Sequence, residues 1–229
     1  MTGICVTYNT KELFQRAYES IRRFHPHLHM IIVDGSDVDN PCHGYVKSLA
    51  SPLNKIYQVG CNIGHGNGMH HALERCDTET ALVFDSDIVM LRSPLSEMLG
   101  LLSSETYGVG WVYEVGYDGF DYGTYPHHVQ KGGVPYLHPY FMLLNKAQYF
   151  KFHRFIHHGA PCYKAMIEIY ERGLSAKLLR NFSGLTGHTS GQGINWIGRP
   201  SKYVQHDFGG TRTTNKLAGK KEIIGKWDR

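Results

Sequence analysis

Two aspartates stand close together directly after an apolar run. Residues 81–84 are Ala-Leu-Val-Phe, and Asp85 and Asp87 follow with one serine between them. Carboxylate oxygens are the ligands that Mg²⁺ and Mn²⁺ prefer, and these ions keep coordination positions for phosphate oxygens. Two aspartates in a turn often only cap or solvate it, but a place at the end of a buried strand favours a functional role. The pair is therefore predicted to hold a divalent metal ion.

A glycine-rich segment is the second candidate for a binding role. Residues 62–68 are Asn-Ile-Gly-His-Gly-Asn-Gly, with a glycine-rich turn predicted over 64–68 and a helix over 69–75. Glycines let the backbone approach a ligand closely, and a helix N-terminus favours anions. The segment matches neither G-x-G-x-x-G nor G-x-x-x-x-G-K-[ST], so neither a dinucleotide-binding motif nor a P-loop is supported. A purely structural turn is the alternative.

The elements that must position these residues alternate between strand and helix. Strands are predicted over 4–8, 30–33, 56–59 and 81–84, and a helix capped by Thr10 follows the first of them. Because the strands are apolar throughout, they indicate a sheet buried on both faces. Strands that alternate with helices form a mostly parallel sheet. The expected fold class is therefore α/β, with a mostly parallel central sheet flanked by helices.

Polar residues collect where these strands end. In open parallel sheets, ligands bind beyond the carboxyl ends of the strands. We therefore expect one cleft at this edge of the sheet, lined by side chains at or after four strand ends: Thr7, Tyr8 and Asn9, then Asp34, then residues 62–67, then Asp85 and Asp87.

The second half of the chain differs in kind. Residues 111–140 are rich in glycine, tyrosine and histidine, which suits stacking on a sugar, a nucleobase or a peptide, or simply the packing of a glycine-rich loop. A buried strand is predicted over 140–144, a helix over 160–172 and a loop over 183–193. No internal repeat or interdomain linker separates these segments, so one domain is expected.

Length and composition exclude several classes of protein. The chain has 229 residues, of which 41% are hydrophobic, and this is too many for a largely disordered chain. No apolar run approaches the roughly 20 residues that span a bilayer. Polar residues 9–12 interrupt the short apolar start, so we expect no signal peptide and a cytoplasmic location. The five cysteines form no C-x-x-C pair, and neither a disulfide framework nor a structural zinc site is expected.

Positive charge is concentrated at the C-terminal end. Residues 199–229 hold eight basic and three acidic side chains, a formal charge of +5, so the other 198 residues sum to −1. Such a segment can face phosphate, nucleic acid or an anionic membrane, or it can simply be solvated.

Taken together, four motifs resemble those of GT-A glycosyltransferases of the family 2 type. Their order and spacing carry the resemblance over about the first 95 residues, in residues 6–9, 31–37, 62–68 and 84–87. The length agrees, because the two-domain GT-B architecture needs a longer chain. The resemblance implies a single GT-A domain over 1–229. Its parts would be a nucleotide-sugar half (1–95), an acceptor-side half (96–198) and a basic C-terminal segment (199–229).

The resemblance also implies a role for each matched position. The first two strand ends would hold the base and ribose of a nucleotide-sugar, for which a UDP-linked donor is expected, and the glycine-rich segment would line the nucleotide pocket. On this chain those positions are Thr7, Tyr8, Asn9 and Asp34 for the strand ends, and Gly64, His65 and Asn67 for the pocket.

A metal centre that uses Mn²⁺ or Mg²⁺ is implied in the same way. Asp85 would lie near the ribose and the metal, and Asp87 would bind the metal that bridges the diphosphate. Many GT-A enzymes add a C-terminal histidine. His206 is the candidate, because Gly-Gly-Thr-Arg follows it closely, and His188 is the alternative.

The basic segment gains a chemical use from this hypothesis. A departing nucleoside diphosphate builds up negative charge, which needs cations or hydrogen-bond donors already in position. Arg212, Lys216 or both are expected to face the diphosphate and close over the bound donor.

The catalytic base is where the chain departs from the family 2 pattern. Inverting members usually carry an Asp or Glu, often as Glu-Asp, well after the two metal-binding aspartates, and no Glu-Asp pair occurs here. A base must reach the acceptor hydroxyl and be unprotonated at the working pH. The candidates are Glu114, Asp118, Asp121 and His138, of which we prefer Asp121. A retaining mechanism would need no such base.

Other functions stay open from the sequence. A nucleotidyltransferase shares the sheet topology, but it would carry a basic glycine-rich signature near the first strand, where residues 7–10 are Thr-Tyr-Asn-Thr. A non-catalytic nucleic-acid or nucleotide-binding module would use the basic segment and the tyrosines. The two ideas combine in a glycosyltransferase that acts on modified DNA bases. The acceptor, whether saccharide, lipid-linked, protein or DNA, and the transferred hexose or pentose are not identified by the sequence.

Overall fold

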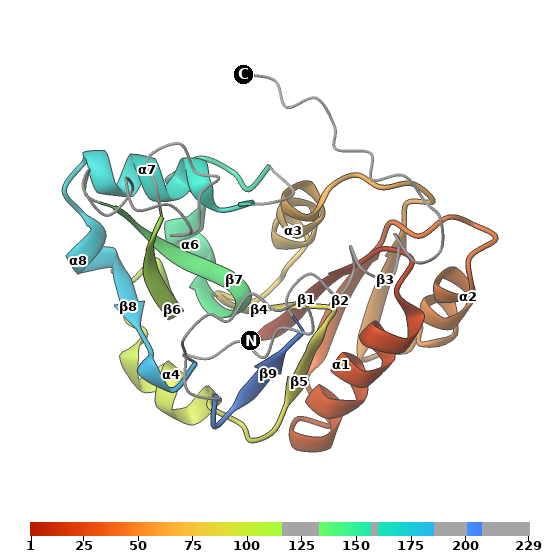
Figure 1. Ribbon diagram of the computed structural model, residues 1–229. Helices are drawn as coiled ribbons and strands as arrows, with labels where there is room; N and C mark the ends of the chain where they lie inside the picture. Colours follow the sequence, from red (N-terminus) through yellow and green to blue (C-terminus); the bar gives the residue numbers. More distant parts are fainter. Residues whose placement is uncertain (116–132, 157–159, 186–200, 208–229) are drawn as a thin grey trace.

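A computed structural model describes residues 1–115, 133–156, 160–185 and 201–207. Within these residues, seven strands form one sheet that carries helices on both faces (Figure 1). In spatial order the strands are β3 (Asn54–Gln58), β2 (His29–Asp34), β1 (Thr2–Thr7), β4 (Thr80–Asp85), β7 (Val134–Asn145), β6 (Gly108–Val115) and β8 (Leu179–Asn181).

The sheet is mostly parallel, as predicted. β7 runs antiparallel to its neighbours β4 and β6, and the other six strands run parallel to one another. The register pairs Thr7 with Asp34 and Asp34 with Gln58, while Val6 pairs with Asp85. The carboxyl ends of β1 to β4 therefore meet at one edge of the sheet, where ligands of such folds bind.

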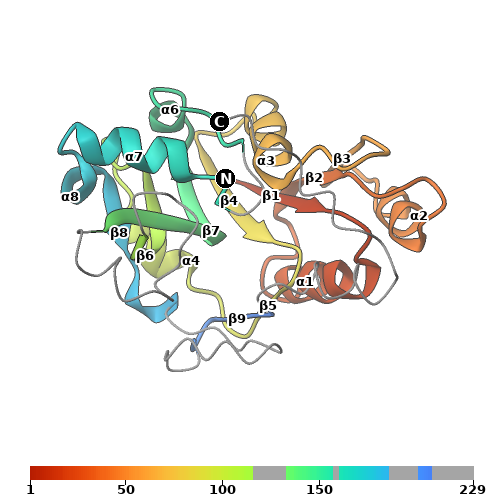
Figure 2. The ribbon, with the colours of Figure 1, turned by 45° about the horizontal axis from the view of Figure 1, so that its top comes forward.

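Helices cover the two faces of this sheet (Figure 2). One face carries α1 (Lys11–Phe24), α2 (Pro41–Ser48) and α4 (Leu95–Leu101), and the other carries α3 (His65–Glu74), α6 (Lys146–Tyr149) and α7 (Tyr163–Glu171). Short α8 (Ser175–Leu178) precedes β8, and the 3₁₀ helix η1 (Ser183–Leu185) follows it. A hydrophobic core lies on each face of the sheet, and consecutive buried residues of β1 point to different cores. Ile4 belongs to the core formed with α3, and Cys5 belongs to the core formed with α1. The prediction of a sheet buried on both faces is confirmed.

The glycine-rich turn predicted over 64–68 is wrong, because helix α3 already begins at His65. Only Gly64, at the N-cap with φ +81°, needs the left-handed conformation that glycine adopts readily. Gly68 has a different purpose: a Cβ there would lie 2.7 Å from Cγ1 of Val6. The glycine thus lets α3 pack closely against β1.

The helix start at Thr10 also differs in detail from the prediction. Thr10 occupies the N-cap of α1, but its side chain makes no capping hydrogen bond. Its Oγ1 instead lies 3.3 Å from Oγ1 of Thr7. A buried neighbour therefore outcompetes the helix end for this hydroxyl.

The second half contains more strand than predicted. The strand expected over 140–144 extends over Val134–Asn145, and β6 lies in a stretch that carried no strand prediction. Gly108 and Gly110 weaken the strand signal in β6. A Cβ at Gly108 would lie 2.6 Å from the Leu137 side chain, so this glycine permits close pairing with β7. The helix expected over 160–172 is α7, and η1 begins the segment expected to be a loop over 183–193.

A two-stranded antiparallel ribbon crosses the face that carries α1 (Figure 1). It pairs β5 (Ile88–Met90) with β9 (Val204–His206). The amide of Met90 donates to Oγ of Ser20 at 2.9 Å, which fixes the ribbon on α1. In the part of the chain that the structure describes, no helix combines the length and the apolar character needed to cross a bilayer.

Candidate metal centre and the neighbouring strand ends

Three segments bring acidic and imidazole side chains together at the end of β4. Asp85 is the last residue of β4, Asp87 directly precedes β5, and His206 is the last residue of β9. The ribbon register places His206 opposite Ile88. The amide of Asp207 donates to the carbonyl of Asp87 at 2.9 Å, which extends the pairing past His206. Backbone pairing therefore fixes the third side chain beside the other two.

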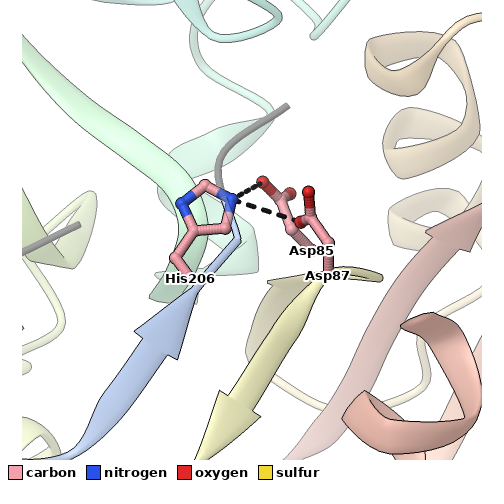
Figure 3. Close-up of side chains that lie close together, drawn as sticks. All are labelled: Asp85, Asp87 and His206. Atoms are coloured by element: carbon pink, nitrogen blue, oxygen red, sulfur yellow. Dashed lines mark ion pairs between the residues drawn. The ribbon is translucent and has the colours of Figure 1, made fainter. Parts of the chain in front are cut away.

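The three side chains point at one another (Figure 3). Nε2 of His206 lies 3.4 Å from Oδ2 of Asp85 and 3.2 Å from Oδ1 of Asp87. One ligand atom from each residue lies within 4.8 Å of the other two, and Asp87 and His206 are buried. The predicted third partner of the two aspartates, His206, is thus in place.

The donor atoms fit a divalent metal ion. Two carboxylates suit Mg²⁺ or Mn²⁺, and an added imidazole suits a transition metal such as Mn²⁺. Oδ1 of Asp85 is buried and has no hydrogen-bond partner among the described residues. A buried carboxylate oxygen without a hydrogen bond is costly, and a bound cation would remove that cost.

The charges at this centre stabilise one another. Burial alone would lower the pKa of His206, but the carboxylates of Asp87 and Asp85 raise it to about 10. Burial alone would raise the pKa of Asp85, yet His65 and His206 hold it well below its ordinary value. Without a metal, a protonated imidazole therefore neutralises part of the negative charge, in the place that a cation would take.

Aromatic rings support His206 from the side of β7. The ring of Tyr140 stacks on that of His206 with centroids 4.8 Å apart and an interplanar angle of 10°. Tyr140 is itself anchored, since its hydroxyl donates to the carbonyl of Leu185. The ring centroids of His138 and His206 are 6.0 Å apart, and Trp111 stacks on His138 with ring centroids 5.7 Å apart. The imidazole is therefore held by packing as well as by backbone pairing.

The end of β1 is joined to the loop that follows β2. The amide of Asn9 donates to Oγ of Ser36 at 2.9 Å, and its side-chain amide exchanges two hydrogen bonds with Asp37, at 2.9 and 3.1 Å. Asn9 has φ 55°, which Asn tolerates better than most residues. Thr7 is buried, and Tyr8 is half-buried. Three hydrogen bonds therefore join the end of β1 to the loop after β2.

Asp34 is the most enclosed of the predicted binding residues. Its Oδ1 accepts a hydrogen bond from the Ser36 amide at 2.9 Å, and its Oδ2 accepts one from Nε2 of Gln58 at 3.3 Å. Nδ1 of His43 lies 3.4 Å from the same Oδ2. The Asp34 side chain has no exposed surface, so its carboxylate is turned toward the protein.

The start of α3 borders the metal centre. His65, the first residue of α3, places Nε2 3.3 Å from Oδ1 of Asp85. The loop before it is braced by two hydrogen bonds, from the Gly64 amide to Asn62 and from the Asn67 side chain to the Ile63 carbonyl. His65 is therefore brought to Asp85, whereas Asn67 is exposed and directed to its own helix end.

Several predicted residues lie outside the described parts of the chain: Asp118, Asp121, His188, Arg212 and Lys216. Two candidate bases are described. Glu114 is exposed on β6. Nδ1 of His138 accepts a hydrogen bond from the Tyr140 amide at 3.1 Å, so the neutral ring carries its proton on Nε2. That tautomer donates at Nε2 and disfavours His138 as a base.

Sequence reasoning missed His43, Gln58 and Tyr140. His43 follows the Asn40 N-cap and Pro41, a helix-start signal that would have placed it beside the end of β2. Gln58 closes β3, where the strand prediction was shifted along the chain. No local signal points from Tyr140 to His206, since the two meet only through the tertiary fold.

Comparison with protein families gives one match. The family model described as Glycosyl transferase family 2 matches residues 4–170. No curated protein matches the sequence significantly.

Solved structures are similar at low identity. The mannosyltransferase PcManGT from Pyrobaculum calidifontis, with GDP-Man and Mn²⁺, is 14% identical with a TM-score of 0.56. The match covers 79% of this chain and 54% of that one, so the chain spans about half its length. GalNAc-T7, with UDP, GalNAc and Mn²⁺, is 9% identical over 90% of this chain and 42% of its own, with a TM-score of 0.59.

A third structure matches over its whole length. The galactosyltransferase LgtC, in complex with donor and acceptor sugar analogs, is 13% identical over 99% of this chain and 100% of its own, with a TM-score of 0.52. At these identities the similarity concerns the fold, a mixed α/β architecture of the GT-A type.

Proposed function

This chain belongs to glycosyl transferase family 2, and from that membership we propose that it transfers a sugar from a nucleotide-sugar, UDP-linked by preference, to an acceptor. The observation that carries the proposal is the meeting of Asp85, Asp87 and His206 at the carboxyl end of β4. Ligands bind at that edge in open α/β sheets. Two structures of similar fold, a mannosyltransferase and GalNAc-T7, contain a nucleotide and Mn²⁺.

Asp85, Asp87 and His206 would hold Mn²⁺ or Mg²⁺. Such an ion, when bound, supplies a Lewis acid for the diphosphate oxygens. The buried Oδ1 of Asp85, which has no hydrogen-bond partner among the described residues, supports this assignment. Tyr140 supports it as well, because its stacking orients the His206 ring toward both carboxylates.

The start of α3 would receive the diphosphate. α3 begins at His65, beside Asp85, and a helix N-terminus favours negative charge through its unpaired amides. The Thr7 to Asn9 corner and the loop after β2 would enclose the nucleoside, and Arg212 would approach the diphosphate from the C-terminal segment. These assignments follow the order of the motifs, and each one is a separate mutational target.

The remaining assignments rest on the sequence. We retain Asp121 as the base that an inverting transfer would use, with a retaining transfer as the alternative that needs none. We also retain one GT-A domain divided into 1–95, 96–198 and 199–229. The transferred sugar is a hexose or a pentose. Modified DNA is kept as an alternative acceptor because of the basic segment over 199–229, and a panel of saccharide, lipid-linked, peptide and DNA acceptors separates it from the others.

The proposal is tested with a panel of nucleotide-sugars in the presence of Mn²⁺. We expect at least one donor to raise the melting temperature and to be hydrolysed slowly, with both effects lost when the metal is chelated. Asp87→Ala should abolish the donor-dependent shift. Asp77→Ala is the matched control, because Asp77 is an exposed aspartate paired with Lys55 away from the site. If no donor shifts the wild type and Asp87→Ala behaves like Asp77→Ala, the assignment is wrong.

A further inference from the structure

A second pair of titratable side chains lies near the metal centre, with one strand of the sheet between them. Asp34 ends β2, which is separated from β4 by β1, and His43 lies in the first turn of α2. Nδ1 of His43 is 3.4 Å from Oδ2 of Asp34. The Asp34 side chain is fully buried, whereas the His43 side chain keeps 17% of its surface exposed. Of the two side chains, only His43 therefore keeps surface that a ligand could contact.

Asp34 is held in one orientation. The Ser36 amide donates to Oδ1, and Nε2 of Gln58 donates to Oδ2 and also to the His43 carbonyl at 2.8 Å. The backbone register places Asp34 beside Gln58 on the adjacent strand. The carboxylate thus cannot turn away from His43 without the loss of hydrogen bonds on both of its oxygens.

This orientation selects a tautomer of His43. Its Nδ1 is buried and makes no hydrogen bond with the described residues. The Asp34 carboxylate, 3.4 Å away, is near enough to interact with it electrostatically. A lone pair on Nδ1 would face the negative charge of Asp34, whereas an N–H there is attracted to it. The neutral ring therefore carries its proton on Nδ1, and Nε2 keeps a lone pair that can accept a hydrogen bond.

We propose that His43 reads the base of the nucleotide donor by accepting a hydrogen bond at Nε2 from a lactam N–H, at N3 of uracil or N1 of guanine. The inference rests on the proposed function and extends it to the class of nucleobase that the donor carries. Asp34 is the positioning residue that sets the tautomer, in place of the direct contact expected from the sequence. Cytosine and adenine carry a lone pair at the corresponding ring nitrogen, which would face the lone pair of His43.

The experiment is a titration of the full chain, with Mn²⁺ present, by UDP, GDP, CDP and ADP. We expect UDP or GDP to bind about tenfold more tightly than CDP and ADP, the scale of one hydrogen bond and its opposed lone pair. The UDP and GDP arms distinguish a pyrimidine from a purine site. If UDP is preferred, 3-methyluridine diphosphate, which lacks the N3–H, should lose about the same factor.

Two variants test the residues themselves. His43→Phe should reduce the preference among the four diphosphates to less than about twofold while binding through the diphosphate persists. His29→Phe is the control, because His29 is an exposed histidine at the opposite end of β2. In Asp34→Asn, the orientation that keeps an oxygen for the Ser36 amide turns the side-chain amide N–H toward Nδ1 of His43, at the cost of the hydrogen bond from Gln58. The imidazole proton then moves to Nε2. This variant should shift the preference from UDP toward CDP, an effect that a merely structural role would not produce.

The outcomes distinguish a failure of the His43 and Asp34 roles from a failure of the proposed function. Diphosphates that bind with the same ranking in the wild type and in His43→Phe would overturn the role of His43 and leave the proposed function intact. An Asp34→Asn variant that folds but weakens all four diphosphates equally would overturn the positioning role of Asp34. A wild type that binds no diphosphate in the presence of Mn²⁺ would overturn the proposed function itself.

Discussion

Asp34 and Asp85 make a natural comparison, because they end the two strands that flank β1. Both are aspartates at the carboxyl edge of the same parallel sheet. Asp34 is fully buried with hydrogen bonds on both oxygens. Asp85 is largely buried, and its Oδ1 accepts no hydrogen bond from the described residues but lies 3.3 Å from Nε2 of His65.

The difference teaches how to separate a supporting carboxylate from a binding one. Position at a strand end is common to both residues, so it does not discriminate between them. A buried oxygen whose hydrogen bonds are made inside the protein has little left to offer a ligand. A buried oxygen without such bonds is costly until something binds it. We therefore expect Asp85 to matter for binding and Asp34 to matter for the local structure and for His43.

The largest expected effect is on activity. Asp85→Asn removes a charged ligand of the candidate metal, and we expect the transfer rate to fall at least about a hundredfold, since even groups that only orient metal ligands are worth tenfold to a hundredfold. The melting temperature without metal should change little, because His206 keeps its contact with Asp87. Turnover of the identified donor measures the first effect. A variant with wild-type turnover would remove Asp85 from the site.

The second effect is on stability. Asp34→Ala leaves the buried Ser36 amide without its acceptor and removes one of the two acceptors of Nε2 of Gln58, so we expect the free energy of unfolding to fall by about 2–3 kcal/mol. Urea denaturation without metal or nucleotide measures it. Asp77→Ala, at an exposed ion pair with Lys55, should cost less than about 1 kcal/mol. Equal losses in the two variants would contradict the supporting role of Asp34.

The third effect is on the pH dependence of metal binding. The pKa of His206 is raised to about 10 without metal, so the ring must release a proton before it can bind a cation. The apparent Mg²⁺ affinity should therefore rise with pH, by about tenfold per unit between pH 7 and 8.5, because one proton is released. Calorimetry in buffers of different ionisation enthalpy counts that proton. In His206→Asn the slope should disappear, and a slope that persists would assign the proton to another group.

The smallest expected effect concerns an ion pair between α1 and the residue that follows β9. Arg16 of α1 pairs with Asp207, the residue after His206, at 3.2 Å, and both side chains are partly exposed. Exposed ion pairs contribute little. Arg16→Ala should therefore weaken metal binding by no more than about threefold, as measured by the same calorimetry. A loss as large as that of Asp85→Asn would mean that the ion pair, and not the β5–β9 pairing, positions His206.

Much of the fold could be predicted from the sequence. The runs that became β1, β2 and β4 are short, mostly apolar without alternation, and followed by polar residues, which predicts burial on both faces. Their alternation with helices predicts the parallel order. β6 could not be found in this way, since Gly108 and Gly110 resemble loop residues until the close approach of β7 explains them. The start of α3 was misplaced for a similar reason, because glycine in a helix is disfavoured unless packing requires it.

In the candidate site too, some residues could be predicted from the sequence and others could not. Asp85 and Asp87 are neighbours in sequence, and a strand end places both of them in any fold that contains this strand. His206 lies more than a hundred residues further along, and only the pairing of β9 with β5 brings it to them. His43 was overlooked because its meaning depends on the orientation of a carboxylate on another element.

The sequence alone therefore determined the fold class, the edge of the sheet at which the polar strand ends meet, and the two aspartates that stand there. Those features depend on local hydrophobic patterning and on neighbours in the chain. The tertiary structure decided which aspartate has hydrogen bonds on both oxygens, which one has an oxygen without a hydrogen bond, and which histidines face them. Hydrogen-bond satisfaction and ligand geometry depend on contacts between distant segments, and no local pattern contains that information.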